Sequence, residues 1–95
     1  MESIFRGFFA RLFGNAAAPA EEDPIEYSGY RIRPTPFPRL GQHQTAGIIE
    51  KDVGGEVKEH RFVRAETHSS REEAVAYSIV KAKQIIDEQG DRIFG

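Results

Sequence analysis

Three histidines are the side chains in this sequence best suited to bind a metal or transfer a proton. They are His43, His60 and His68, and they fall in three different segments of the chain. Zinc sites usually place two of their ligands close together in the sequence, and no pair of these histidines has that spacing. The chain also lacks cysteine, so it offers neither a thiolate metal site nor a disulfide. We therefore expect no bound metal, and histidines that are solvated or hydrogen-bonded.

The other residues with chemical potential also lack the motif that their chemistry needs. Ser69 and Ser70 have no Gly-x-Ser-x-Gly motif around them and stand where the cap of a helix is expected. The pair Gly54-Gly55 is no phosphate-binding loop, because neither a Lys-Ser or Lys-Thr pair nor the start of a helix follows it. Without a second layer of structure to form a cleft, we expect no enzymatic activity, cofactor or small-molecule substrate.

Length and composition fit one small domain. The chain has 95 residues, of which 39% are hydrophobic and 11% aromatic, and its net charge is -2. Residues 25–95 carry 11 basic and 11 acidic side chains. Nucleic-acid-binding domains usually have a basic excess, so this balance supports such binding only weakly. The chain contains neither the run of about 18 apolar residues that would span a bilayer nor a secretory signal, and we expect a cytoplasmic protein.

One long amphipathic helix is predicted in the last third of the chain. Ser70 with Glu73, or Ser69 with Glu72, forms a capping box at its start. Gly90 supplies the left-handed residue with which such helices end. Four apolar residues at helical spacing are expected to face a sheet: Val75, Ile79, Ala82 and Ile86.

The segments before this helix alternate apolar and polar residues in the way that half-buried strands do. The three predicted strands are residues 26–33, with a bulge or turn at Gly29, residues 42–51 and residues 57–65. We therefore expect an α+β fold, in which a three-stranded antiparallel sheet is covered on one face by a long C-terminal helix and preceded by a short N-terminal amphipathic helix. The corresponding organisation is an amphipathic segment at residues 1–14, a linker at residues 15–25 and a β-β-β-α domain at residues 26–95.

Two further expectations concern the connections. Pro34, Pro36 and Pro38 favour an extended connector after the first strand. After the helix, Ile93 and Phe94 are expected to pack against the sheet.

The register of the last two strands depends on the loop at Gly54-Gly55. A two-residue loop would place Glu50 opposite Glu59 and Lys51 opposite Lys58, and like charges in such positions repel. Either of two three-residue loops would instead pair opposite charges. The pairing rule disfavours the two-residue loop and leaves the register open.

The N-terminal segment is the first candidate interaction surface. Arg6 and Arg11 lie on one side of its predicted helix, and about half of the cylinder is apolar and strongly aromatic. Such a face binds a membrane surface, a partner protein or the protein's own sheet, and these alternatives remain open. The residues predicted for membrane or partner docking are Ile4, Phe5, Phe8, Phe9, Leu12 and Phe13.

Two more candidate surfaces lie on the predicted domain. The sheet face away from the helix could contact the phosphates of DNA or RNA, or other anions, through basic residues from two strands; the alternative is a solvated face neutralised by Glu26, Glu50 and Glu59. The basic residues are Arg31, Arg33, Lys58, Arg61 and Arg64. The outer side of the helix could form a homodimer or partner seam, or lean on the edge of the sheet. The seam residues are Ala76, Tyr77 and Val80.

Several stretches of the chain together carry a family likeness. The longest are Glu59-His60-Arg61-Phe62-Val63-Arg64-Ala65-Glu66-Thr67, Ser70-Arg71-Glu72-Glu73-Ala74 and Lys83-Gln84-Ile85-Ile86-Asp87-Glu88-Gln89-Gly90. Shorter ones are Arg11-Leu12-Phe13-Gly14, Tyr30-Arg31-Ile32-Arg33-Pro34 and Ala46-Gly47-Ile48-Ile49-Glu50-Lys51. The chain thereby resembles the small bacterial HlyU-type family, in its alphaproteobacterial branch, over nearly its whole length.

The resemblance implies a role in regulation. The family is described as a transcriptional activator of haemolysin expression, and it brings no catalytic residues to carry over. A helix-turn-helix needs two adjacent helices joined by a tight turn, whereas the residues here predict one helix after the linker. We therefore expect a small non-enzymatic regulatory or interaction protein with a protein partner or a second copy as its target. Peripheral membrane attachment through residues 3–13 and nucleic-acid binding through the open sheet face are the alternatives.

Overall fold

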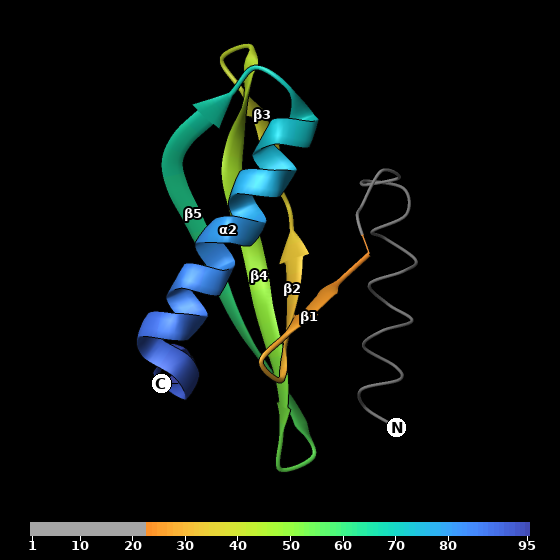
Figure 1. Ribbon diagram of the computed structural model, residues 1–95, viewed down its shortest axis with the longest axis vertical. Coiled ribbons are helices and arrows are strands. Elements are labelled where there is room, and N and C mark those ends of the chain that lie inside the picture. Colours follow the sequence, from red (N-terminus) through yellow and green to blue (C-terminus); the bar gives the residue numbers. More distant parts are fainter. Residues whose placement is uncertain (1–22) are drawn as a thin grey trace.

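The computed structural model describes residues 23–95, in which five antiparallel strands form one sheet and one α-helix crosses one face of it (Figure 1). The expected α+β class with a C-terminal helix is confirmed, and the predicted N-terminal helix lies outside the described residues. The elements in order are β1 (Ile25–Tyr27), β2 (Tyr30–Pro34), β3 (Phe37–Arg39), β4 (Gln42–Val53), β5 (Glu56–His68), α2 (Arg71–Gln89) and the 3-10 helix η1 (Gly90–Phe94).

Strand β4 is the centre of the sheet. β5 pairs with it along one edge, while β2 and then β3 pair with successive parts of its other edge, and β1 pairs with β2. The prediction of three strands is therefore wrong in number. The first predicted strand folds back on itself as a β1–β2 hairpin, and the proline-rich connector contributes β3. The N–H of Thr35 donates to the carbonyl of Ala46 at 2.9 Å, which holds the connector against β4.

All three hairpins turn through two residues with positive φ angles, as in type I′ turns, whose twist matches that of the strands. The residues are Ser28-Gly29 (53° and 85°), Leu40-Gly41 (52° and 79°) and Gly54-Gly55 (58° and 84°). The predicted turn at Gly29 is confirmed. The turn at Leu40-Gly41 was not expected, because leucine seldom adopts a positive φ angle.

The register of β4 and β5 is the one that the like-charge rule disfavoured. Glu50 lies opposite Glu59, and Lys51 lies opposite Lys58. The rule failed here because it considered two strands only. Glu50 is neutralised from its other side by arginines of β2, and Lys51 donates to Asp91 of η1 at 3.0 Å.

Helix α2 begins as predicted. The N–H of Glu73 donates to Oγ of Ser70 at 3.1 Å, so the structure selects the first of the two possible caps. At the other end, Gly90 has a φ angle of 57° and its N–H donates to the carbonyl of Ile86.

The face of α2 that packs on the sheet matches the predicted stripe in part, because Ala82 and Ile86 are buried as predicted. Val75 and Ile79 are half-buried, and the first half of the helix packs through small residues spaced by four. Small side chains bring the helix close enough for Oγ of Ser78 to accept from the N–H of Ala46 at 3.2 Å. The fully packed helical residues are Ala74, Ser78, Ala82, Ile85 and Ile86.

A single core lies between this helix and the sheet. Ile32 of β2 and Ile49 of β4 face each other at its centre and are 0% exposed. Ile93 and Phe94 of η1 pack against the same cluster, as predicted. The core thus lies on the face of the sheet that α2 covers, and the opposite face carries many of the polar residues.

Candidate interaction surface

The face of the sheet away from α2 is built by simple alternation. Successive side chains of a strand point to opposite faces, so the neighbours of buried Ile32 and Ile49 point away from the helix. The paired registers of β2, β4 and β5 bring these neighbours into adjacent rows. We call this set the outer face: Arg31, Arg33, Ile48, Glu50, Asp52, Val57, Glu59, Arg61 and Val63.

Glu50 is the centre of the outer face. It is 8% exposed although it lies on the side of the sheet away from α2. One carboxylate oxygen, Oε1, accepts from Nε of Arg31 at 3.3 Å and from Nε of Arg33 at 3.2 Å. A charge this shielded needs such partners, because burial of an unpaired carboxylate costs several kcal/mol, roughly. The two arginines therefore cover Glu50 and neutralise it.

Arg31 is held by a second carboxylate. Its Nη1 and Nη2 donate to Oδ2 and Oδ1 of Asp52 at 3.3 and 3.2 Å, in a two-pronged arrangement. The pKa of the Arg31 guanidinium is raised, first by these hydrogen bonds to Asp52 and then by Glu50. Two-pronged pairs of this kind fix the orientation of both side chains.

The predicted basic residues do not all share this face. Arg61 lies on it, with its Nη2 3.7 Å from Oε1 of Glu59 on the same strand. Lys58 lies on the helix side, in the row of Lys51, and its Nζ is 3.5 Å from Glu56. Arg64 also lies on that side, with its guanidinium carbon 5.9 Å from the centre of the Phe62 ring. Three arginines therefore remain on the outer face, each beside a carboxylate.

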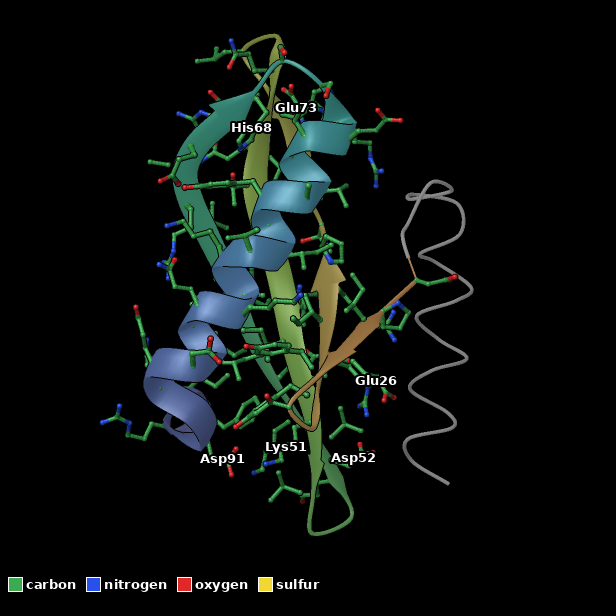
Figure 2. All side chains as sticks on the ribbon, in the orientation of Figure 1. Glu26, Lys51, Asp52, His68, Glu73 and Asp91 are labelled. Carbon is green, nitrogen blue, oxygen red and sulfur yellow. The ribbon has the colours of Figure 1, made fainter. Side chains whose placement is uncertain are left out.

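The three residues predicted to form a seam on the helix also differ in their surroundings. Tyr77 is half-buried, because its ring lies 5.0 Å from that of His68 and its hydroxyl donates to Glu66 at 3.4 Å. It thus leans on the end of β5, while Ala76 and Val80 stay exposed. Figure 2 shows His68 at the end of the molecule where β5 leads into α2.

Two of the three histidines lie closer together than their spacing in the sequence indicates. His43 and His68 are direct neighbours across β4 and β5, and Nε2 of His68 lies 3.2 Å from Oγ1 of Thr45. His60 lies elsewhere, opposite Ile49. Within residues 23–95, no group of three potential ligands is arranged to hold a metal ion.

A second polar cluster, which the sequence patterns did not reveal, fastens the end of the helix to the sheet. The hydroxyl of Tyr27 donates to Asp87 at 2.9 Å, and that of Tyr30 donates to Asp91. Nζ of Lys51 completes the cluster at 3.0 Å from Asp91, and Figure 2 shows these two side chains close together near the C-terminus. We call Tyr30, Lys51 and Asp91 the tyrosine clasp.

The clasp shifts the titration of its members. The hydrogen bond to the Asp91 carboxylate, with burial, raises the pKa of Tyr30 to about 12. The same hydrogen bond and the one from Lys51 lower the pKa of Asp91. Since its hydrogen bonds tie β2 and β4 to η1 beside the end of α2, the clasp stabilises the fold. No sequence pattern points to the clasp, because Tyr30, Lys51 and Asp91 belong to three elements that are far apart in the chain.

Taken together, these features define a class of protein. It is a small α+β domain in which one face of the sheet packs the core and the other face carries paired charges. The part of the chain that the structure describes contains a single α-helix, so it forms no helix-turn-helix, and no helix in it is long and apolar enough to cross a bilayer.

The family is also established. The family model for HlyU, described as transcriptional activator HlyU, matches residues 7–94, and this chain belongs to that family. The family resemblance inferred from the sequence is thereby confirmed, and its alphaproteobacterial branch stays a prediction. No curated protein and no solved structure matches the chain.

Proposed function

We propose that this protein acts in the control of transcription without catalysing a reaction, by binding a partner protein through the outer face of its sheet. The regulatory role is supported by the family, which is described by an activity on transcription. The mode of action is supported by one observation above all, the pairing of Glu50 with both Arg31 and Arg33.

Charge pairing makes the outer face a poor phosphate-binding surface. Proteins bind nucleic acid by neutralising phosphates with arginines and lysines that are free to do so. Here the phosphates would meet Glu50, Asp52 and Glu59 in the same rows as the arginines. The start of α2 is no better, because Glu72 and Glu73 occupy its first turn.

A protein partner suits the same surface well. Arginine is enriched at protein interfaces, and a planar guanidinium group whose charge is already paired can still stack on, and donate to, uncharged groups of a partner such as backbone carbonyls. Ile48 lies half-buried at the middle of the face, and Val63 is 56% exposed beside it. Apolar side chains surrounded by charges in fixed positions have the composition of an interface core and rim.

The test is complementation in cells. In a strain lacking this protein, transcript levels are measured after return of the wild-type chain, the outer-face variant Arg33→Ala/Ile48→Ala, or the matched control Arg64→Ala/Val80→Ala. The control removes the same kinds of side chain from other surfaces, where Arg64 and Val80 are exposed. We expect the wild type and the control to restore transcript levels and the folded outer-face variant to fail.

Two results would contradict the proposal in different ways. Unchanged transcript levels on loss of the protein would remove the regulatory role. Full complementation by the outer-face variant would leave the role intact and remove the outer face as its contact surface.

We propose peripheral membrane attachment as a second candidate function, because residues 3–13 concentrate four phenylalanines on a short segment. These residues lie outside the part of the chain that the structure describes. Flotation with anionic phospholipid vesicles compares the full chain with a chain lacking residues 1–18. We expect the full chain to float and the shortened chain to remain below; equally negligible binding by both would dismiss this function.

A further inference from the structure

We propose that two copies of this chain pair antiparallel along the free edges of their β5 strands, which joins two sheets into one. β5 runs for 13 residues and pairs with β4 on one side; no other strand of residues 23–95 pairs with it. In Figure 1 its second half curves along the margin of the sheet with no other described element beyond it. A long free edge is a template for a further strand.

The backbone groups available on this edge follow from the hairpin. In the two-residue turn at Gly54-Gly55, the carbonyl of the first flanking residue, Val53, accepts from the N–H of the second, Glu56. The register then runs unbroken from this pair to Ala46 opposite Val63. Because antiparallel bonding alternates, every second residue of β5 bonds to β4 and the others direct both backbone groups outward. The outward residues are Val57, Glu59, Arg61 and Val63.

Only some registers are open to such a dimer. Under two-fold symmetry, a residue one place before the axis faces the residue one place after it in the other copy. Outward residues must face outward residues, so the axis passes through a residue position and not between two. Each contact made by one copy is then repeated by the other.

Side-chain charge favours an axis at His60. With that axis, Glu59 faces Arg61 of the other copy, and Glu56 faces Arg64. Val57 faces Val63, which gives an apolar partner to a side chain that is 56% exposed in the single chain. Opposite charges and β-branched pairs in directly facing positions both stabilise a sheet.

Registers shifted by one position place like charges together. An axis at Arg61 would place Arg61 opposite Arg61 of the other copy, and Lys58 opposite Arg64 of the other copy. An axis at Glu59 would set two Glu59 carboxylates against each other. A shift to Phe62 avoids repulsion, but it leaves Glu59 facing Ala65 and Arg61 facing Val63. The charges along β5 therefore specify one register.

The side chains needed for this pairing are accessible. Glu59, Arg61 and Val63 are exposed, and the side chain of Arg61 is 71% exposed. The contact between Arg61 and Glu59 within one chain, at 3.7 Å, is long and solvated. Exchange of this weak contact for two equivalent contacts between copies costs little.

Charge reversal in the full-length chain tests the pairing. We expect sedimentation to show a concentration-dependent dimer. Arg61→Glu and Glu59→Arg should each weaken it about tenfold or more, because each places like charges at two sites. The double variant Glu59→Arg/Arg61→Glu should restore it, and the control Arg39→Glu on β3 should leave it unchanged. A monomer at every concentration, or a dimer that ignores these changes, would overturn the proposal.

Hydrogen exchange and a crosslink locate the contact. On dimerisation the amides of Glu59 and Arg61 should become protected, while that of His60, already bonded to β4, should not change. His60→Cys should form a disulfide between copies, since facing Cα atoms at such a position are about 4.5 Å apart and the chain has no other cysteine. Ala65→Cys, out of register on the same strand, should not. Equal crosslinking at both positions, or none at position 60, would contradict the pairing.

Discussion

Glu50 is the residue that most affects the charge of the outer face, because it pairs with two of its arginines. It lies on the face of the sheet away from α2, yet two arginines shield it from water. An acidic residue on an exposed strand face would ordinarily be solvated and interchangeable. Here it accepts from Nε of both arginines and so helps to fix where their guanidinium groups point.

Neutralising this residue should cost stability. We expect Glu50→Gln to lower the free energy of unfolding by about 1–3 kcal/mol, because two charge-assisted hydrogen bonds are lost at a poorly solvated site. Glu59→Gln, on the same face but exposed, should change it by less than about 0.5 kcal/mol. Urea unfolding of both variants and the wild type measures these values. Equal, small effects would mean that Glu50 is not the centre of the network.

The tyrosine clasp makes stability depend on pH at the alkaline end. The pKa of Tyr30 is about 12 in the folded protein and about 10 in an unfolded chain. The neutral phenol is therefore favoured by folding, and its contribution is complete below pH 10. It is lost as the pH rises from 10 to 12, because the unfolded chain then ionises first.

This dependence can be isolated with one substitution. Urea midpoints measured between pH 9 and 12 should fall more steeply for the wild type than for Tyr30→Phe, which lacks the hydroxyl. Asp91 has the opposite dependence on pH. Because its pKa is lowered, its contribution to stability is present at pH values above its ordinary pKa of 3.8 and is lost on acidification. Parallel alkaline curves for the two proteins would show that Tyr30 does not carry the effect.

At the scale of elements, Gly47 of β4 and Phe62 of β5 face each other and approach closely. A Cβ atom on Gly47 would lie 2.7 and 2.8 Å from ring carbons of Phe62 and 3.1 Å from the carbonyl oxygen of Arg33. Glycine stands here for lack of space, since no positive φ angle requires it. The ring of Phe62 fills the position above the strand that a side chain would otherwise take.

This explanation predicts a compensating pair. Gly47→Ala should destabilise the protein by about 1–3 kcal/mol through crowding against the ring. Phe62→Leu makes room, so the double variant should lose less stability than the two single changes added together. Urea unfolding of the four proteins provides the comparison. Strict additivity would show that the two sites are independent.

The elements that the sequence predicted well are those whose signals are local. The capped helix was predictable because Ser70, Glu73 and Gly90 act on their own neighbours in the chain. Its packed face was less predictable, because Ala74 and Ser78 are buried by the nearness of β4 and not by their own hydrophobicity. Periodicity weights large apolar residues and so favoured Val75 and Ile79.

In the sheet too, the features that depend on residues distant in sequence were not predictable. The two-residue turn at Gly54-Gly55 could not be chosen from the pair Glu50 and Glu59, because the deciding partners lie on β2 and are distant in sequence. β3 was missed because prolines and a leucine in the turn are unusual for a hairpin. Likewise, alternation placed Arg31 and Arg33 on one face correctly, and it also separates Arg61 from Lys58 and Arg64. Only the register shows that Arg61 is the one that shares the face of Arg31 and Arg33.

At the scale of the whole molecule, the two sides of the sheet differ. One side packs the core under α2, and the other is the surface that we propose binds a partner. The buried core of the described part lies under α2 and η1, while three arginines paired with carboxylates share the outer face with Ile48, Val57 and Val63. Such a division suits a regulator that works by binding. It also explains how the family's description in terms of transcription can apply to a chain whose residues 23–95 lack a helix-turn-helix.

The most direct measurement is a fluorescence anisotropy titration of labelled duplex DNA at low and moderate salt. It compares the wild type with Arg33→Gln/Arg61→Gln, which leaves Arg31 to hold Glu50, and with the matched control Lys58→Gln/Arg64→Gln on the opposite face. We expect all three proteins to give the same weak response, abolished at moderate salt, because the outer-face arginines are already neutralised. Saturable binding that persists at moderate salt and is lost only in Arg33→Gln/Arg61→Gln would contradict a regulator that works through protein contact.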